Sequence, residues 1–359
     1  MSTTRKSTAT VLAATLAVGT LAGCSGSDTS TSDTDTVTLV SHDSFAASKK
    51  VLKAFEKETG YRLRVLKNGD AGEAVNKALL TKDHPQGDVL FGVDNTLLSR
   101  ALDHHLFQPY AARDRNRIDA QFRTGPGAHH VTPVDTGDIC VNYDRAYFTR
   151  HHLAPPKTYD DLTDPAYRNL LVTENAATSS PGLGFLLGTA ARYGDNGWQD
   201  YWKKLKAAGV KVVDSWEQAY NEEFSGSAGG RKAGGDRPLV VSYASSPPAE
   251  AIYADPQPKT APTGVATGTC FRQIEYAGLL AHARNPEGGK ALLDFLISRR
   301  FQEDMPLNMF VDPVRRDARL PALYRRYAVE VDHPRTMAPN RIASHRDAWV
   351  KTWTSLVLK

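Results

Sequence analysis

Residues 87–107 read GDVLFGVDNTLLSRALDHHLF, and this stretch decides the fold. Its first part, VLFGV, is a continuous apolar run, which is typical of a strand buried on both faces in a parallel sheet. The part after it repeats apolar residues at helical spacing, with Asn95 or Thr96 in position to cap a helix. A strand followed by a helix is the unit of α/β folds, so we expect an α/β protein.

The same alternation continues on both sides of this stretch. Upstream, the pattern predicts strands at 37–45 and 61–66 and helices at 48–60 and 72–82. Downstream, it predicts strands at 169–174, 210–214 and 237–243 and helices at 179–194, 197–209 and 215–224. Two such regions in a chain of 359 residues favour two domains or one bilobed domain.

Two segments, 131–144 and 264–280, are placed to cross between these regions, and each contains one cysteine. In an oxidising compartment, an even pair such as Cys140 and Cys270 favours a disulfide. The bond would pin the two crossing strands to each other. Reduced, buried cysteines are the alternative.

The N-terminus is typical of an exported chain. Basic residues precede about 15 small and apolar residues, which are fewer than the roughly 20 that a membrane span needs. The sequence LAGC at 21–24 resembles the lipobox of bacterial lipoproteins, which implies a signal peptide at 1–23 and lipidation of Cys24. The polar stretch at 24–36 then predicts a flexible tether. Ordinary secretion, with an incidental cysteine, is the alternative.

Several function classes find no support in the sequence. A net charge of +4, without a block of basic residues, argues against nucleic acid as a partner. Motifs of hydrolases, metalloproteases and nucleotide-binding loops are absent, so we expect no enzyme activity and no cofactor. Three His-His pairs stand out, but adjacent side chains point apart, so we expect no metal site. The glycine-rich segment 225–237 is expected to be a mobile surface loop.

Polar and aromatic residues gather where the predicted strands end and the helices start. In open α/β sheets, ligands lie at the carboxyl ends of strands. The candidates at these positions are His42, Asp43, Asp70, Asp94, Ser179, Ser180, Gly182, Trp216, Tyr243 and Ser245. Carboxylates suit a cation, aromatic faces suit a flat or cationic ring, and a helix start suits an anion such as phosphate. The expected ligand is flat and cationic, and able to carry a phosphate.

Each candidate also has a purely structural interpretation. Asp43, Asp94 and Ser180 are residue types that cap helices. Trp216 and Tyr243 are equally compatible with the core. The prediction of a binding site therefore depends on the set of residues and not on any single one.

Five segments in order resemble the thiamine-binding proteins of bacterial ABC importers. They read HDSFAAS, GDAGEAVNKALLTKDHPQGDVLFGVDNTLLSRAL, SSPGLGFLL, DSWEQAY and LVVSYASSP, and the resemblance extends from about Val37 to Pro313, with HRDAWVKTW matching a late helix. It implies a type II periplasmic-binding fold with two α/β lobes, a strand-crossover hinge and C-terminal helices. Lobe 1 would comprise 37–135 and 268–359, and lobe 2 would comprise 136–267.

The resemblance also implies a ligand and partners. Thiamine or its phosphate esters would lie among aromatic residues, with the rings of Trp216 and Tyr243 stacking on the ligand. Ser179 would lie near a phosphate. Phe310 falls where relatives can have a Trp. The chain departs from enteric relatives at His42 and at Ala249, where they have tyrosines. The implied partners are an ABC permease and its ATPase. The chain itself would be a monomer on the extracytoplasmic face of the cell membrane, held there by its lipid anchor alone.

Two other ligands remain open on the same fold, a polyamine and ferric iron. Polyamine sites need several acids with aromatic residues, which this chain has. Iron-binding relatives commonly use paired tyrosines, and this chain has no Tyr-Tyr. An extracytoplasmic hydrolase and a structural surface protein are less favoured, because no catalytic motif is present and the acids and aromatics cluster at strand ends.

Overall fold

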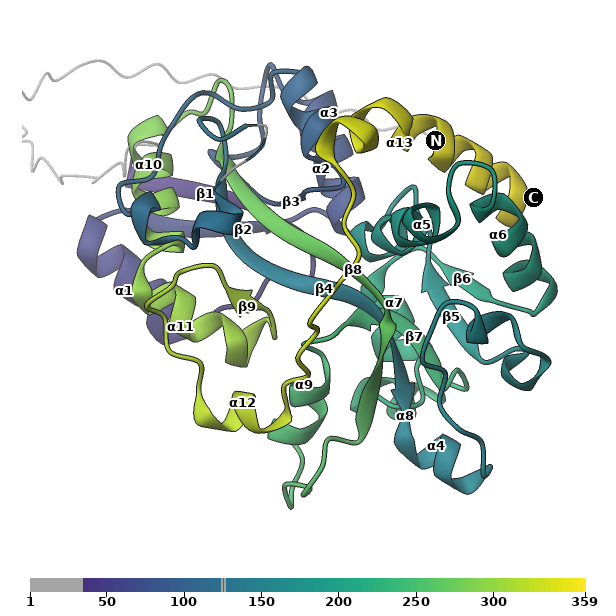
Figure 1. The fold of residues 1–359 in the computed structure, drawn as a ribbon. Coiled ribbons are helices and arrows are strands. Elements are labelled where there is room, and N and C mark those ends of the chain that lie inside the picture. The colour runs from purple at the N-terminus through teal and green to yellow at the C-terminus, as the bar shows by residue number, and fades with distance from the viewer. Residues whose placement is uncertain (1–34, 124, 126) are drawn as a thin grey trace, which may run out of the picture. The chain divides into compact units, whose positions relative to one another are not determined.

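The computed structural model describes residues 35–123, 125 and 127–359. Its strands form one mixed sheet in the order β2-β1-β3-β8-β4-β7-β5-β6, with β9 paired to β4 (Figure 1). The predicted signal peptide, Cys24 and nearly all of the predicted tether lie outside the described residues. Among the described helices, none has both the length and the apolar character that a membrane span needs.

One end of the sheet consists of three parallel strands, β2 (Arg62–Lys67), β1 (Thr36–Ser41) and β3 (Val89–Asp94). Every residue of β3 is buried, as the continuous apolar run VLFGV predicts. Helices pack on this end: α1 (Lys49–Thr59), α2 (Ala71–Leu80), α3 (Leu98–Asp103), α10 (Pro286–Leu296) and α11 (Arg299–Asn308). Val51 and Phe55 of α1 are buried in the same core as Val37 and Leu39 of β1.

Two long antiparallel strands connect the two ends of the sheet: β4 (Thr132–Asp144) and β8 (Thr263–Leu279). Cys140 and Cys270, one from each strand, form a disulfide with an S–S distance of 2.04 Å. The ladder is irregular beside this bond, because Ile139 pairs with Phe271 while Val141 pairs with Ala266. The lobe boundaries expected from the sequence fall inside these two strands and stay a prediction.

The other end of the sheet contains β7 (Leu239–Tyr243), β5 (Leu171–Glu174) and β6 (Lys211–Val213). Its main helices are α5 (Ser180–Tyr193) and α6 (Trp198–Ala207). Trp198 and Trp202 of α6 are fully buried, and Trp202 meets Trp353 of the C-terminal helix α13 (Pro339–Val357) edge to face at 5.4 Å. The C-terminal helix thereby closes the core at this end (Figure 1).

Shorter elements complete the chain. They are α4 (Arg145–Arg150), α7 (Trp216–Gln218) with a π-helical turn at Ala219–Glu223, α8 (Ala228–Ala233), α9 (Pro247–Ile252), β9 (Asp312–Pro313) and α12 (Ala322–Tyr327). Single 3-10 turns lie at Arg115–Arg117, Ala120–Phe122, Asp161–Thr163 and Pro165–Tyr167.

Two local predictions were wrong. The segment 225–237 is not a loop throughout, because Ser227 caps the short helix α8 by accepting a hydrogen bond from the N–H of Gly230 at 2.8 Å. Neither Asn95 nor Thr96 caps α3. The carboxylate of Asp94 instead accepts hydrogen bonds from the backbone N–H groups of Thr96 and Leu97, at 3.0 and 3.2 Å.

Candidate functional site

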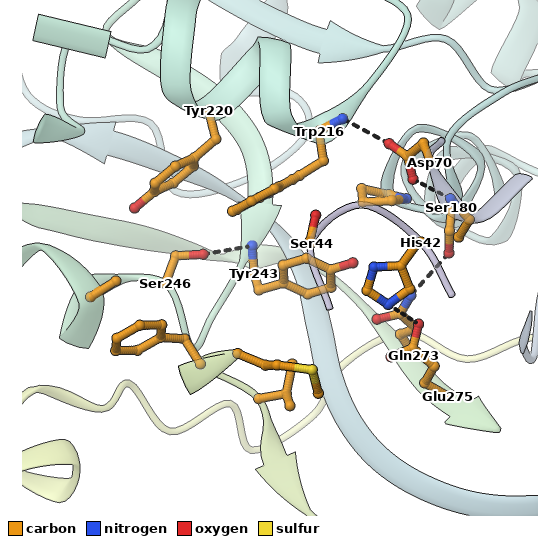
Figure 2. A pocket seen from close by; sticks show the side chains of 16 residues that line it. His42, Ser44, Asp70, Ser180, Trp216, Tyr220, Tyr243, Ser246, Gln273 and Glu275 are labelled. Carbon is orange, nitrogen blue, oxygen red and sulfur yellow. Dashed lines mark hydrogen bonds and ion pairs between the residues drawn. The ribbon is translucent and has the colours of Figure 1, made fainter. Parts of the chain in front are cut away.

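A pocket with a cavity volume of about 80 Å³ lies where the crossing strands meet the starts of several helices. Its walls come from the segment after β1, the starts of α2, α5 and α7, the turn between β7 and α9, strand β8 and the segment after α11 (Figure 2). The lining residues are His42, Ser44, Asp70, Ala71, Ser180, Pro181, Trp216, Tyr220, Tyr243, Ser246, Ala249, Gln273, Glu275, Met309, Phe310 and Val311.

Three aromatic rings form one wall of the pocket. Trp216 stacks on Tyr220 with ring centroids 4.9 Å apart and planes 15° apart, and Tyr243 lies 6.4 Å from Trp216. The indole Nε1–H of Trp216 donates to Ser242 Oγ at 2.9 Å, which fixes the ring plane. Figure 2 shows Trp216 and Tyr243 on the same side of the pocket. This wall presents π faces to a planar or cationic ligand.

Asp70 joins two helix starts at the edge of the pocket. Its Oδ1 accepts the N–H of Ala71 at 2.6 Å, and its Oδ2 accepts the N–H of Trp216 at 2.8 Å. Burial raises the pKa of Asp70, and these two hydrogen bonds oppose that rise. Asp70 therefore uses both of its oxygens within the protein while its carboxylate still lines the pocket.

A second acidic group lies behind the start of α5. The hydroxyl of Ser180 donates to Asp94, and the Nε2 of Gln273 donates to Asp94 Oδ2 at 3.0 Å and to Ser180 Oγ at 2.9 Å. Asp94 is fully buried. Burial raises its pKa, while the hydrogen bonds from Ser180, Thr96 and Gln273 act in the opposite direction.

Glu275 and Asp135 are direct cross-strand partners on β8 and β4. Burial raises the pKa of Glu275 to about 8, and the neighbouring side chain of Asp135 opposes this rise. Burial also raises the pKa of Asp135 well above its usual value, and the carboxylate of Glu275 raises it further. The two carboxyl groups therefore hold at least one proton between them at neutral pH.

His42 faces this carboxyl pair from the segment after β1. Its Nε2 lies 3.3 Å from Glu275 Oε1. Burial lowers the pKa of His42, although nearby acids raise it, so we expect a neutral imidazole near pH 7. The ring packs on Gly92, where an added Cβ would lie 2.5 Å from His42 Cδ2.

Six of the residues predicted from sequence line the pocket: His42, Asp70, Ser180, Trp216, Tyr243 and Phe310. Phe310 has a φ of 56°, which is unusual for a bulky residue, and its ring meets Tyr253 edge to face at 5.9 Å. Such a conformation at a pocket wall is typical of a residue held in place for binding.

The other five predicted residues lie outside the pocket lining. Asp94, Ser179 and Ser245 are buried behind it, and Gly182 is packed against the carbonyl of Glu174. Asp43 is exposed and accepts the N–H of Gly69 at 3.1 Å. It lines a wider outer cleft that adjoins the pocket. Their structural roles explain these residue types, as the capping interpretation of Asp94 anticipated.

Sequence reasoning missed Gln273 and Glu275, which carry much of the polarity of the pocket. Both lie on β8 at alternate positions, so they point to the same face. The sequence does contain a signal for them, because it places two polar residues at alternate positions in a segment that crosses between the two regions. Tyr220, Met309 and Val311 gave no comparable signal, because they reach the pocket from the π-helical segment and from the turn after α11.

Metal ligands are not assembled in the described part of the chain. No group of three or more His, Cys, Asp or Glu there is arranged to hold a metal ion. His105 and His152, from two of the His-His pairs, have positive φ values of 52° and 51° just after α3 and α4.

The mixed sheet with two crossing strands, and a pocket beside the crossing, form the arrangement of the type II periplasmic-binding fold. A family described as bacterial extracellular solute-binding protein matches residues 85–232. Solved structures agree with this fold. The ferric binding protein from Campylobacter jejuni has a TM-score of 0.69 at 16% identity, covering 89% of this chain and 99% of that chain. The predicted fold class is confirmed.

The names of the relatives with similar sequences specify a ligand, which the fold alone does not. The thiamine-binding periplasmic protein of Salmonella typhimurium is 29% identical over 89% of this chain and 93% of its own length. Its counterpart in Escherichia coli is 28% identical with the same coverage of both chains. A solved periplasmic thiamin binding protein has a TM-score of 0.78 at 26% identity, covering 90% of this chain and 96% of that chain. The resemblance found in the sequence is confirmed.

Proposed function

We propose that this chain is an extracytoplasmic solute-binding protein that captures thiamine, or its phosphate esters, in the pocket described above. The observation that carries the proposal is the combination of a stacked aromatic wall with buried acids. Trp216 and Tyr243 suit the two rings of thiamine, and Asp70 and Glu275 suit the positive charge of its thiazolium. The similarity to thiamine-binding periplasmic proteins supports the same ligand.

The proposed mechanism is hinge closure without a chemical step. Strands β4 and β8 are the only long connections in the described sheet between its two ends, so they are the elements that would bend. Hydrogen bonds already join the two predicted lobes over the pocket, from Trp216 N–H to Asp70 and from Glu73 N–H to the carbonyl of Thr178. Ligand contacts with both sides would favour this closed arrangement.

Delivery to an ABC permease with its ATPase completes the proposed role. The relatives are named as periplasmic binding proteins and not as enzymes. We propose that Cys24 carries a lipid that holds the chain at the extracytoplasmic face of the membrane, and that the protein acts as a monomer without a cofactor. Mass spectrometry of the mature N-terminus tests the anchor, and a mature chain that starts elsewhere than at Cys24 would exclude it.

Calorimetric titration of the purified chain with thiamine, thiamine monophosphate, thiamine diphosphate and spermidine tests the ligand. We expect submicromolar binding of at least one thiamine compound. Binding of spermidine alone would replace thiamine with a polyamine, which the acids of the pocket also suit. Failure of all four ligands would leave the fold with a different cargo.

A further inference from the structure

The pocket opens into the outer cleft, the wider space that adjoins it. The outer cleft has a cavity volume of about 530 Å³, whereas the pocket has about 80 Å³. The opening between them consists of the residues that line both spaces, which are Ser44, Trp216, Tyr220, Ala249, Met309 and Phe310. A ligand that fills the pocket therefore has room beside it, into which a larger ligand can extend.

Ala249 has the smallest side chain of the opening. It is half-buried on the short helix α9 and lines both spaces. Its backbone is held in place, because its N–H donates to the carbonyl of Ser246 at 3.0 Å and the hydroxyl of Ser246 lies 2.9 Å from Ser242 Oγ. A larger side chain at position 249 would project from this fixed backbone into the opening. The width of the opening therefore depends on this alanine.

The two sides of the pocket differ in polarity. Figure 2 shows Tyr220 and Ser246 on one side of Trp216, and on the other side the polar residues His42, Asp70, Ser180, Gln273 and Glu275. The opening lies on the first side, since Tyr220 lines it and Ser246 directly precedes the helix that carries Ala249. A thiazolium cation is most stable beside the acids. The uncharged aminopyrimidine ring of thiamine would then face the opening.

The chemistry of thiamine decides which substituent would enter the outer cleft. The methylene bridge to the thiazolium leaves the pyrimidine ring at C5′, and the 2′-methyl group is attached at the opposite side of that ring. A group at C2′ therefore points away from the thiazolium, along the length of the molecule. With the thiazolium beside the acids, this group would point through the opening.

Aromatic surface lines the outer cleft where it joins the pocket. Trp216 stacks on Tyr220 with ring centroids 4.9 Å apart, and Tyr253 meets Phe310 edge to face at 5.9 Å. The hydroxyl of Tyr253 donates to the carbonyl of Leu307 at 2.8 Å, which fixes the position of this ring. Such a surface gains stability when an apolar group covers it.

The charged side chains of the outer cleft already contact protein groups. Lys67 Nζ donates to the carbonyl of Asp43, and Arg231 lies 3.8 Å from Glu250. Glu217 accepts a hydrogen bond from the side-chain amide of Asn221 at 2.6 Å. A charged substituent would have to compete with these contacts, so the cleft favours an uncharged one.

We infer that the outer cleft is a subsite for the pyrimidine end of the ligand, and that Ala249 is the residue that admits ligands to it. The class of ligand is thiamine compounds in which an uncharged alkyl or alkoxy group longer than methyl stands at C2′. This inference rests on the proposed function, because it names the range of ligands that the same site takes.

The test compares thiamine with 2′-propylthiamine, in which a propyl group replaces the 2′-methyl group. Both dissociation constants are measured by calorimetry on the purified full-length chain at one pH and salt concentration. We expect the wild-type protein to bind the two compounds with constants that agree within about fivefold. A closed pocket would reject the longer group, because one methylene that does not fit an apolar pocket costs about tenfold or more in affinity.

Substitutions at position 249 test the opening itself. Ala249→Tyr fills it with a phenol ring, so the ratio of the constant for 2′-propylthiamine to that for thiamine should rise at least about tenfold. Ala249→Leu should raise the ratio by a smaller factor, and it keeps the test independent of the folding of the tyrosine variant. Ala348→Tyr is the matched control, because Ala348 is exposed on the helix α13 and lines neither space. It should leave the ratio unchanged.

Two results would overturn the inference and leave the proposed function intact. The first is wild-type protein that binds thiamine but binds 2′-propylthiamine more than about fivefold more weakly. The second is a ratio that neither variant at position 249 changes, which would show that the propyl group does not pass Ala249. If the wild-type protein binds neither compound, the proposed function fails and this inference fails with it.

Discussion

Asp70 Oδ2 accepts the backbone N–H of Trp216 at 2.8 Å, which connects the start of α2 to the start of α7 across the edge of the pocket. The close approach of α2 on this side depends on Gly72, where a Cβ would lie 2.4 Å from the carbonyl oxygen of Thr178. A carboxylate that lines the pocket thus also positions the main aromatic face. Charge recognition and ring stacking are therefore coupled through one hydrogen bond.

Trp216→Ala should weaken thiamine binding by about 1–3 kcal/mol, the scale of a lost stacking or cation–π partner. Trp216→Phe keeps an aromatic face and loses only the hydrogen bond to Ser242, so its loss should be smaller. Calorimetric titration of both variants provides the measurement. An unchanged affinity in Trp216→Ala would make this residue a bystander.

Thiamine affinity should rise with pH between about 6 and 8. Burial raises the pKa of Glu275 to about 8, so its carboxyl group is mostly protonated at pH 7 in the empty pocket. A bound cation favours the ionised form, so the pKa falls on binding and affinity grows as pH rises. Asp135, Asp94, Asp70 and His42 interact with Glu275 and also shape the curve. Titrations at several pH values should show a flatter curve for Glu275→Gln.

The stability of the empty protein should change in the opposite direction. An acid whose pKa is higher in the folded state than in the unfolded state stabilises the fold. This contribution is fully present at pH values below the pKa of the unfolded state. That contribution is lost as pH rises toward the folded value of about 8 for Glu275. Thermal melting of the empty protein should therefore show a Tm that falls from pH 5 to 8. A Tm that rises over this range in the wild type and falls in Glu275→Gln would contradict the assignment.

Removal of the disulfide should destabilise the fold more than it affects binding. Replacing both Cys140 and Cys270 with Ala frees a loop that spans 130 residues of the unfolded chain. The expected loss is about 2–4 kcal/mol in the free energy of unfolding. Denaturant titration measures it, and reduction of the wild-type protein should give a similar loss. Two free thiols in the unfolded, unreduced wild-type protein would show that the bond does not form.

The fold could be predicted from the sequence because its signals are local. The apolar run of β3 and the tryptophan spacing in α6 identified buried elements, since each depends only on neighbouring residues. The helix α8 was missed because Gly-rich composition favours loops, whereas Ser227 supplies a cap that composition does not reveal.

The site was predictable only in part, for a physical reason. Strand ends and helix starts are visible in the sequence, so His42, Asp70 and Trp216 were found. The pairing of Asp135 with Glu275 depends on the register of β4 and β8, which no local pattern specifies. Whether a serine contacts a ligand or a carboxyl group also depends on contacts between distant segments. Ser180, for example, donates its hydroxyl proton to Asp94.

Gly92→Ala should disturb the site through His42, and a second glycine provides a matched control. Gly92 has a φ of 105°, and a Cβ there would lie 2.5 Å from His42 Cδ2. Gly60 has a φ of 78° with nothing within 4 Å of an added Cβ. Both alanines should cost about 1–2 kcal/mol of stability through the left-handed backbone. Only Gly92→Ala should also weaken thiamine binding, because the imidazole must move. Equal affinities for the two variants in calorimetry would show that the position of His42 does not matter for binding.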